Sequence, residues 1–292
     1  MTFLSGFEKI ARQAEPLAMH TWFQLGGPAE YFAEPENPEQ LIALLQRSQE
    51  EGLEVRLLGQ GSNLLICDEG VPGVVVKLSA AEFAKIQITG RRIIAGGGAS
   101  LGRVVTTAVH HGLAGLEMLI GIPGTLGGAL HGNSGTRGGD VGQWATAATV
   151  ITNNGEVMTR GRDDLVFGYR ESSLDDLVIL DGSFQLEEDD PHELARRMQK
   201  QWIVKKAGQP MGHQCAGCIF KNPRGTSAGE LIEQAGLKGT RIGGAVVSDR
   251  HANFIIAEPE ATSQDVLRLI ELIRSQVRDR LGIDLELEIE IW

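Results

Sequence analysis

Cys215 and Cys218 are the residues whose types and spacing suggest chemistry most directly, and His213 stands two residues before the pair. A C-x-x-C pair can act as a redox dithiol or supply half of a zinc site. A complete zinc site needs a second pair of ligands, however, and Cys67 is the only other cysteine. The βαβ pattern expected around a thioredoxin-like dithiol is also missing. We therefore predict no metal site, and metal binding and regulatory thiol chemistry remain alternatives for this pair.

The first of two glycine-rich segments is LGQGSNL at residues 58–64, directly after a predicted strand. Its glycines allow backbone amides to turn toward an anion, and Ser62 and Asn63 add side-chain donors. The segment is neither a GxGxxG loop that opens a helix nor a P-loop with GK[ST]. It indicates a pyrophosphate-binding loop, for which a plain strand-to-strand turn is the alternative.

The second glycine-rich segment is GIPGTLGGALHGNSGTRGGD at residues 121–140. Ordering so many glycines costs backbone entropy, and a closely approaching ligand is the natural compensation. Pro123 stiffens the start of the segment, and Asn133 and Ser134 can hydrogen-bond the edge of a heterocycle or serve as turn residues. The segment therefore predicts contact with a nucleotide.

Short strands and helices must position these segments. Asn37, Pro38 and Gln40 have the types and spacing of a helix start, with an asparagine cap, proline at the first position and glutamine three residues after the cap. Branched apolar runs and caps predict a helix over 38–51, strands at 55–58, 74–78 and 92–95, and a helix from Ser100 to about Gly112. This first part is predicted to be α+β, with glycine loops between its elements.

The second half begins with strands, because branched apolar runs flank an Asn154-Gly155 hairpin signal. A glycine- and proline-containing stretch at 207–212 marks the main domain boundary, so we predict domains at 1–78, 79–206 and 207–292. We expect strands within 145–185, including 177–184, helices at 191–205, from Ser227 to Gly236 and at 262–281, and strands at 254–257 and 285–291.

Charge and composition exclude several classes of protein. The formal net charge of −11 argues against a nucleic-acid partner, since such proteins carry a basic face. The first 20 residues lack the apolar region of a secretory signal, and no window approaches the ~18 apolar residues of a membrane span. Three cysteines make no disulfide framework. These features predict a cytoplasmic protein with no membrane partner.

Two motifs together resemble a known flavoprotein family. The pairing of LGQGSNLLI (58–66) with GIPGTLGGALHGNSGTRGG (121–139) resembles the FAD-binding lobes of the UDP-N-acetylenolpyruvoylglucosamine reductases, the MurB family, and HTWFQLGGPA (20–29) is similar to its opening segment. The resemblance implies an α+β fold: a two-lobed FAD-binding fold of the vanillyl-alcohol-oxidase (PCMH) type, formed by 1–78 and 79–206, and a C-terminal α+β substrate-binding domain, 207–292. It implies non-covalent FAD held by Gly59, Gly61, Ser62, Asn63, Leu64, Pro123, Gly124, Gly127, Gly128, Asn133, Ser134 and Gly135.

Three further stretches carry the family's chemistry. GYRESSL (168–174) is similar to its G-Y-R-x-S element, which implies that Arg170 stabilises an enolate and that Tyr169 contacts the substrate. Without the resemblance, Arg170 would be read as a surface cation at the end of a strand. LELEIE (285–290) is similar to the family's closing strand, which implies that Glu288 is a catalytic residue. The alternative is that Glu288 belongs to an acidic, solvent-exposed face of an edge strand.

The third stretch, AGCIFKNP (216–223), departs from the family's G-S-x-F-K-N-P motif at one position, because Cys218 replaces the usual serine. In the family that serine protonates a substrate carbon. A thiol with an ordinary pKa of about 8.5 is mostly protonated at neutral pH and can do the same. Lys221 and Asn222 match positions expected to hold substrate or nicotinamide phosphates.

The implied reaction is the NADPH-dependent, FAD-mediated reduction of UDP-N-acetylglucosamine enolpyruvate in peptidoglycan synthesis, with this UDP-sugar as the small-molecule partner. Only 47 residues separate Arg170 from Cys218, which resembles the shorter, type II-like form of the family. We expect a monomer. A flavin-dependent oxidase of a small alcohol and a nucleotide-binding module that senses redox state through its cysteine pair remain the alternatives.

Overall fold

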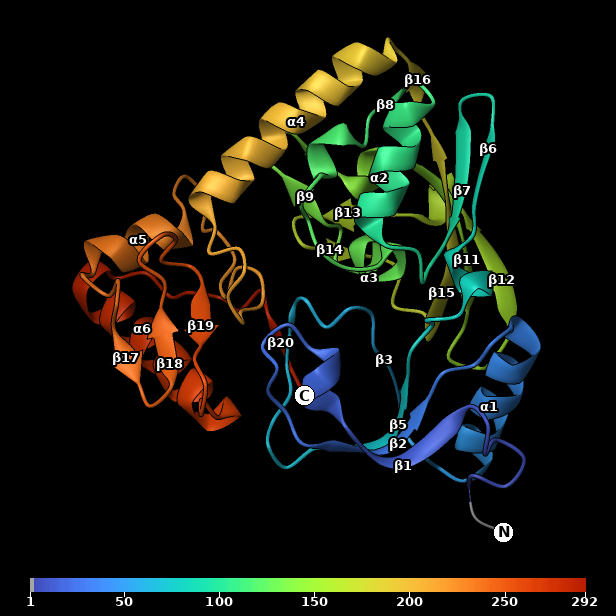
Figure 1. Cartoon of the computed structure of the whole chain (residues 1–292), viewed down its shortest axis with the longest axis horizontal. Helices are drawn as coiled ribbons and strands as arrows, with labels where there is room; N and C mark the ends of the chain where they lie inside the picture. Colours follow the sequence, from blue (N-terminus) through green and yellow to red (C-terminus); the bar gives the residue numbers. More distant parts are fainter. Residues whose placement is uncertain (1–2) are drawn as a thin grey trace. The chain divides into compact units, whose positions relative to one another are not determined.

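The structure, a computed structural model, describes residues 3–292 and divides into two compact units (Figure 1). Unit 1 comprises the residues up to Gln13, Tyr31–Gly59 and Pro72–Lys205. Unit 2 comprises Ala14–Glu30, Gln60–Val71 and Lys206–Trp292. The three-domain division predicted from the sequence stays a proposal.

The N-terminal sheet has four strands in the order β1 (Ala11–Pro16), β2 (Pro28–Ala33), β5 (Val71–Val76) and β3 (Val55–Leu57), and β3 runs parallel to β5. Helix α1 (Pro38–Glu50) buries Leu41 and Leu44 in the core beside this sheet, together with Val74. The predicted helix start is confirmed. Asn37 accepts a hydrogen bond from the Gln40 amide, and the Gln40 side chain accepts one from Glu36.

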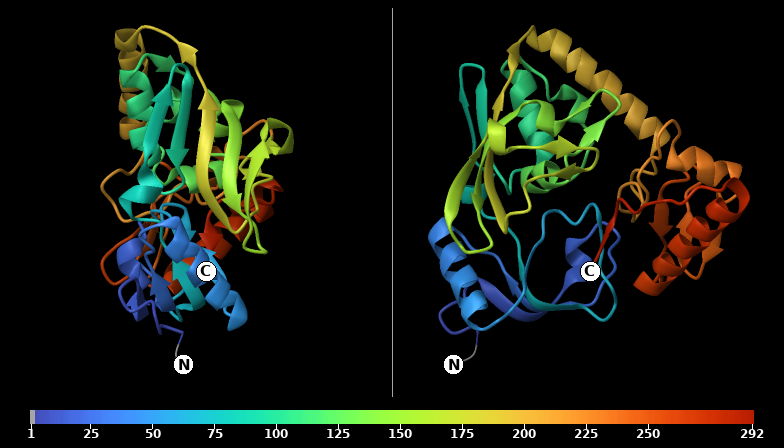
Figure 2. Two further views of the ribbon diagram at one scale, coloured as in Figure 1. Left: turned by 90° about the vertical axis from the view of Figure 1, so that its right-hand side faces the viewer. Right: turned by 180° about the vertical axis from the view of Figure 1, so that it is seen from behind.

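The larger sheet of unit 1 is antiparallel throughout, in the order β12 (Val157–Gly161), β11 (Ala145–Ile151), β15 (Val178–Gln185), β7 (Arg92–Gly96) and β6 (Ile86–Thr89). The hairpin predicted at Asn154-Gly155 joins β11 to β12. Helices α2 (Leu101–His110) and α3 (Leu126–His131) pack against this sheet (Figure 2) and share its apolar core. Helix α4 (Pro191–Gly208) follows and runs three residues beyond the prediction.

Unit 2 contains a small antiparallel sheet of β17 (Arg241–Ile242), β18 (Ala245–Val247) and β19 (Ile255–Ala257), with helices α5 (Ala228–Gln234) and α6 (Ser263–Leu281). Thr262 and Asp265 form a capping box at the start of α6, and Gly282 ends that helix in the left-handed conformation. The apolar face of α6 packs into a core that includes Phe23, Leu65 and Phe220. Residues far apart in the sequence therefore build unit 2.

The remaining elements are short. They are the strands β4 (Leu64–Leu65), β8 (Leu113–Ala114), β9 (Gly135–Thr136), β10 (Gly139–Asp140), β13 (Phe167–Gly168), β14 (Glu171–Ser172), β16 (Glu187–Glu188) and β20 (Glu290–Ile291), and single 3-10 turns at Leu17–His20, Ala81–Ala84, Glu117–Leu119, Val141–Gln143 and Arg162–Asp164.

The continuous closing strand predicted at 285–291 is wrong in its extent, because only Glu290–Ile291 forms a regular strand. The segment changes partner along its length. Its first half forms an antiparallel bridge between Leu287 and Phe220, and its second half pairs in parallel with β4. One regular strand cannot pair along the same edge in antiparallel fashion with one segment and then in parallel with another, so the strand is interrupted. Leu285 and Ile289 are buried as the alternation predicts, whereas Ile291 is 37% exposed.

Across the described residues, 3–292, none of the helices combines the length and the apolar character that crossing a membrane requires.

Candidate functional site

The two glycine-rich segments meet in unit 1. A Cβ atom placed on Gly59 would lie 2.8 Å from the Thr125 hydroxyl, so the close approach of these segments requires a glycine at position 59. Thr125 caps α3 by accepting a hydrogen bond from the Gly128 amide at 3.3 Å. The amides of Leu126 and Gly127 donate to the carbonyls of Ala99 and Gly97. Protein contacts thus account for part of the glycine content that the sequence attributed to a ligand.

Asn133 joins two backbone segments of unit 1 and is only 4% exposed. Its Nδ2 donates to the Gly168 carbonyl at 2.7 Å, and its Oδ1 accepts from the Gly142 amide at 3.1 Å. The neighbouring Ser134 uses its own amide and carbonyl in backbone hydrogen bonds with Ala129 and Val141. Contact of Asn133 and Ser134 with a cofactor remains a prediction.

Tyr169 and Arg170 form the tip of a two-residue hairpin between β13 and β14. Arg170 has φ = 62°, a left-handed conformation that is uncommon for a residue with a Cβ atom. Its Nη1 donates to the Gly135 carbonyl at 3.1 Å, and its guanidinium carbon lies 5.3 Å from the centroid of the Tyr169 ring, within cation–π range. Tyr169 as a whole residue is 51% exposed. The hairpin therefore holds Arg170 firmly and presents Tyr169 to solvent.

Lys205, on α4, brings a second positive charge to Arg170, and the sequence did not single it out. Its ammonium donates to the Ile120 carbonyl at 2.5 Å. Burial, reinforced by the charge of Arg170, lowers the pKa of Lys205 from 10.5 to about 8. Two cations close together in a partly buried setting favour an anionic ligand. The only signal in the sequence was the basic character of the 191–205 helix, in which nothing distinguishes Lys205 from its neighbours.

The lowered pKa of Lys205 predicts a pH dependence of stability. Between about pH 8 and 10.5 the unfolded chain holds a proton on Lys205 that the folded chain has released, so the free energy of unfolding should rise with pH in this window. Lys205→Met should reduce that slope by up to about 1.4 kcal/mol per pH unit, and by less where water screens the ammonium. Chemical denaturation at a series of pH values measures it.

The matched control is Lys200→Met, on the exposed part of the same helix, which should keep the wild-type slope. Equal slopes in the two variants would show that Lys205 titrates normally.

In unit 2, residues 60–64 of the first glycine-rich segment contact the two stretches that carry Cys218 and Glu288. The Ser62 carbonyl accepts from the Gly217 amide at 2.9 Å, and Asn63 Nδ2 donates to the Glu288 carbonyl at 2.9 Å. A Cβ atom on Gly61, which has φ = 62°, would lie 2.4 Å from the His20 carbonyl. Leu64 pairs with Glu290. These hydrogen bonds hold the segment against the stretches that carry Cys218 and Glu288.

The backbones that carry Cys218 and Glu288 lie side by side in unit 2. The Glu288 amide donates to the Ile219 carbonyl at 2.8 Å, and the Lys221 amide donates to the Glu286 carbonyl at 2.8 Å. Cys218 and Glu288 are both partly buried, whereas the Glu286 side chain is 79% exposed. Glu288 therefore differs from Glu286 in being partly buried, although both belong to the same alternating acidic stretch. Arg170 belongs to unit 1.

Lys221 and Asn222, predicted to hold phosphates, have protein contacts in unit 2. The Lys221 ammonium lies 3.8 Å from the Glu286 carboxylate, and both side chains are at least partly exposed. Asn222 Oδ1 accepts from the Ala228 amide at 3.0 Å, at the start of α5. Contact of either residue with a phosphate remains a prediction.

Within residues 3–292, Cys67, Cys215 and Cys218 form no disulfide bond. Burial raises the pKa of Cys215 to about 11, so this residue stays a thiol at neutral pH and is a weak nucleophile. Residues 3–292 contain no group of three or more His, Cys, Asp or Glu side chains placed to hold a metal ion. A reactive dithiol or zinc site at Cys215 and Cys218 therefore gains no support.

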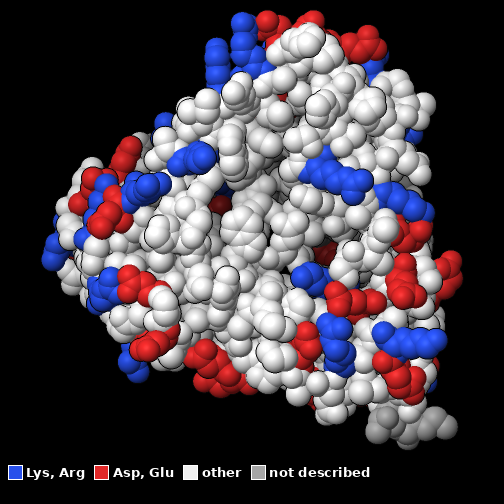
Figure 3. All heavy atoms as spheres, in the orientation of Figure 1, with Lys and Arg blue, Asp and Glu red and all other residues white. Residues whose placement is uncertain are grey.

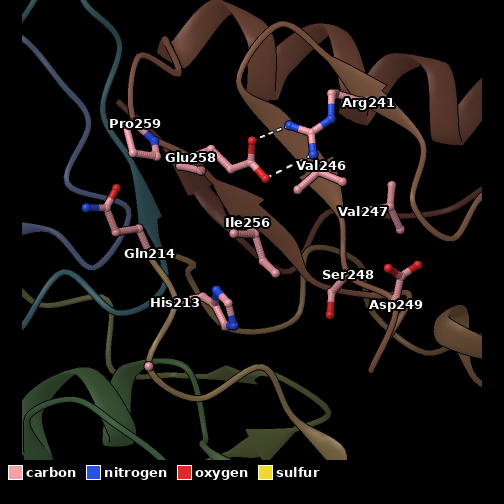
Figure 4. Close-up of a pocket in the computed structure, with 12 residues that line it drawn as sticks. His213, Gln214, Arg241, Val246, Val247, Ser248, Asp249, Ile256, Glu258 and Pro259 are labelled. Carbon is pink, nitrogen blue, oxygen red and sulfur yellow. Dashed lines mark hydrogen bonds and ion pairs between the residues drawn. The ribbon is translucent and has the colours of Figure 1, made fainter.

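A cavity of about 380 Å³ opens on the small sheet of unit 2 (Figure 4). Its walls include His213, Ser248 and Asp249, and the ion pair between Arg241 and Glu258 closes one side. The predicted site residues do not line this cavity.

Comparison with known proteins gives matches across the chain. Residues 29–161 match a family model described as an FAD binding domain, and residues 209–292 match the model of the UDP-N-acetylenolpyruvoylglucosamine reductase C-terminal domain. UDP-N-acetylenolpyruvoylglucosamine reductase 2 of Symbiobacterium thermophilum is 43% identical over 283 residues, which are 96% of this chain and 92% of that protein. The Bacillus subtilis reductase is 37% identical over 95% of this chain and 92% of its own length.

A solved structure agrees with the sequence comparisons. The crystal structure of UDP-N-acetylenolpyruvylglucosamine reductase (MurB) from Thermus caldophilus has a TM-score of 0.82 and 39% identity to this chain, covering 97% of this chain and 98% of that one. The predicted fold class is confirmed: an α+β protein with a two-lobed FAD-binding fold of the vanillyl-alcohol-oxidase (PCMH) type and the C-terminal domain of this family.

Proposed function

Since the chain belongs to the UDP-N-acetylenolpyruvoylglucosamine reductase family, we propose that it catalyses the NADPH-dependent reduction of UDP-N-acetylglucosamine enolpyruvate to UDP-N-acetylmuramate. It is an FAD-dependent oxidoreductase of peptidoglycan synthesis. The observation that carries this function is the near-full-length match at 43% identity, which includes the C-terminal domain with Cys218 and Glu288.

The residues present fit an FAD cofactor. The loops at 59–64 and 121–135 would hold it, within a chain that matches an FAD-binding domain model from residue 29 to 161. A Cβ atom on Gly128 would meet the protein no closer than 3.5 Å, so protein packing alone does not demand glycine there. A ligand that passes close to this backbone would explain why position 128 is a glycine. FAD held there would supply the hydride-transfer chemistry that links NADPH to the substrate.

Arg170 has the chemistry to stabilise the enolate. Hydride addition to the enolpyruvyl double bond places negative charge on the α-carbon and its carboxylate, and a fixed guanidinium with planar donors suits that charge. The hydrogen bond to Gly135 and the hairpin geometry hold Arg170 in place before substrate arrives. The ammonium of Lys205 adds to the positive potential at Arg170. Tyr169, at the same hairpin tip, is available to contact the substrate.

Cys218 donates the proton that completes the reduction, and Glu288 assists from the adjacent backbone segment. The proton leaves the Cys218 sulfur for the substrate α-carbon, and solvent then reprotonates the thiolate. Ser62 and Asn63 brace this pair of segments in unit 2. Lys221 and Asn222, in the same stretch as Cys218, are proposed to hold phosphates of the substrate or of NADPH.

The purified chain tests this function directly. We expect a yellow flavin spectrum, and NADPH oxidation that depends on added UDP-N-acetylglucosamine enolpyruvate. Simple primary alcohols should not reduce the flavin, which distinguishes the enzyme from an alcohol oxidase. Absence of substrate-dependent turnover after saturation with FAD would refute the proposal.

We further propose a monomeric, cytoplasmic enzyme of the shorter, type II-like form, with neither nucleic acid nor membrane as a partner. The net charge of −11 supports the absence of a nucleic-acid partner. On the face shown in Figure 3, basic and acidic side chains are interspersed rather than gathered into a basic field. The division into two FAD-binding lobes, 1–78 and 79–206, and a substrate-binding domain, 207–292, belongs to the same proposal.

A further inference from the structure

Two reciprocal hydrogen bonds join the 133–135 loop to the hairpin that carries Arg170. Asn133 Nδ2 donates to the Gly168 carbonyl at 2.7 Å, two residues before Arg170. Arg170 Nη1 donates in return to the Gly135 carbonyl at 3.1 Å, two residues after Asn133. Each segment therefore fixes the other at two points. Gly168 leads into the hairpin tip and Arg170 is part of it, so the first bond fixes the backbone and the second fixes the guanidinium.

The other end of the Asn133 amide is anchored as well. Its Oδ1 accepts from the Gly142 amide at 3.1 Å. Gly142 packs so closely on Phe167 that a Cβ atom there would lie 2.3 Å from the ring. The side chain of Asn133 is thus held between the strand that enters the hairpin and the segment packed beneath it. At 4% exposure it is shielded from water, so a lost hydrogen bond would not be replaced cheaply by solvent.

The backbone at both ends of this contact is in a sparsely populated conformation. Asn133 has φ = 40° and Arg170 has φ = 62°. Residues with a Cβ atom hold such angles only where the surrounding contacts determine them. Asparagine is among the residues that tolerate this region best, whereas arginine has no such preference. Two-residue hairpin turns favour φ > 0 at their tip, and the Asn133 bond to Gly168 fixes the backbone that leads into this tip.

We propose that Asn133 is a positioning residue for the reaction: its amide holds the 168–170 hairpin in the conformation that aims Arg170 at the developing enolate. The proposal rests on the role of Arg170 given under Proposed function. It assigns the Asn133 side chain a task other than hydrogen-bonding the flavin. Asn133 acts through the backbone of Gly168, and a misplacement of Arg170 by about 1 Å is enough to cost up to a hundredfold in rate.

The test compares Asn133→Asp, which keeps the shape and the acceptor but loses the donor to Gly168, with Asn133→Gly, which tolerates φ > 0 and keeps the variant foldable. Asn37→Ala is the matched control, because Asn37 is an asparagine of the same unit that also accepts a backbone hydrogen bond, at the start of α1. Rapid mixing measures flavin reduction by NADPH and flavin reoxidation by the enolpyruvyl substrate separately, with each FAD-saturated enzyme. FAD affinity is measured alongside.

We expect both Asn133 variants to reoxidise at least about tenfold more slowly, with reduction by NADPH and FAD affinity within about twofold of wild type. Asn37→Ala should leave both rates unchanged. In an Arg170→Ala background, Asn133→Asp should have no further effect on reoxidation, since the residue that it positions is gone. An additive effect in that background, or a loss of FAD affinity with a normal reoxidation rate at saturation, would overturn the proposal. If Arg170→Ala alone reoxidised normally, the proposed role of Arg170 would fail instead.

Discussion

Replacing Arg170 with alanine should slow flavin reoxidation by the enolpyruvyl substrate by about a hundredfold or more, while reduction by NADPH stays within about twofold of wild type. The reason is that the guanidinium meets charge that develops only as hydride reaches the substrate, so its loss raises the barrier of that half-reaction. Stopped-flow absorbance of the flavin separates the two half-reactions. Arg170→Lys should fall between the two enzymes, because it keeps the charge but loses the planar fork.

Arg160→Ala is the matched control for Arg170→Ala. Arg160 lies in the same unit, is also partly exposed, and forms an ion pair with Asp176 at 2.8 Å. Its removal should lower stability modestly and leave both flavin half-reactions unchanged. Because Arg170→Ala removes the hydrogen bond to Gly135 from a residue at φ = 62°, thermal unfolding of this variant must be followed as well. Slowed reduction by NADPH in Arg170→Ala, equal to the loss in reoxidation, would point to a damaged flavin site and contradict the proposed role.

Local patterns predicted the regular elements well. The cap formed by Asn37 and Gln40, the hairpin at Asn154-Gly155 and the start of α6 at Thr262 each depend on residues within about four positions, and the structure confirms all three. Such signals act between residues that are close in the sequence, so they can be recognised without a structure. Ser100 is a partial exception, because it precedes α2 without forming a side-chain cap.

The hydrogen bonds that hold the site residues in place were not predictable, because they join segments far apart in the chain. Asn133 reaches 35 residues to Gly168, and Asn63 reaches 225 residues to Glu288. In unit 2 the buried Asn253 similarly holds both backbone groups of Phe220, two residues after Cys218. A hydrogen bond from a side chain to a distant backbone leaves no periodic pattern. An asparagine in a loop is equally typical of a turn.

The glycine-rich segments show how a correct family resemblance can rest on an incomplete physical account. The sequence explained their glycines by a ligand, whereas Gly59 and Gly61 are required by the nearby Thr125 and His20. Packing within the protein and the binding of a cofactor impose the same residue type. Only the space around each glycine separates the two causes: at Gly128 a Cβ atom would meet the protein at no less than 3.5 Å.

Cys218 is the departure from the family motif with the clearest expected consequence. Cys218→Ala should reduce steady-state turnover by about a hundredfold or more, because general-acid catalysis contributes that much and alanine has no proton to give. Reduction of the flavin by NADPH should be unaffected. Cys218→Ser should retain activity within about tenfold of wild type, because a hydroxyl restores the residue type usual in the family.

The controls are the two other cysteines. Cys215→Ala removes a buried thiol whose pKa burial raises to about 11, and Cys67→Ala removes one whose pKa burial also raises. Neither should change the protonation step. A solvent deuterium isotope effect on turnover should be present in wild type and in Cys218→Ser, since in both a proton from sulfur or oxygen reaches carbon. Full activity in Cys218→Ala would remove Cys218 from the mechanism and leave Glu288, on the adjacent backbone segment, as the remaining candidate for the proton donor.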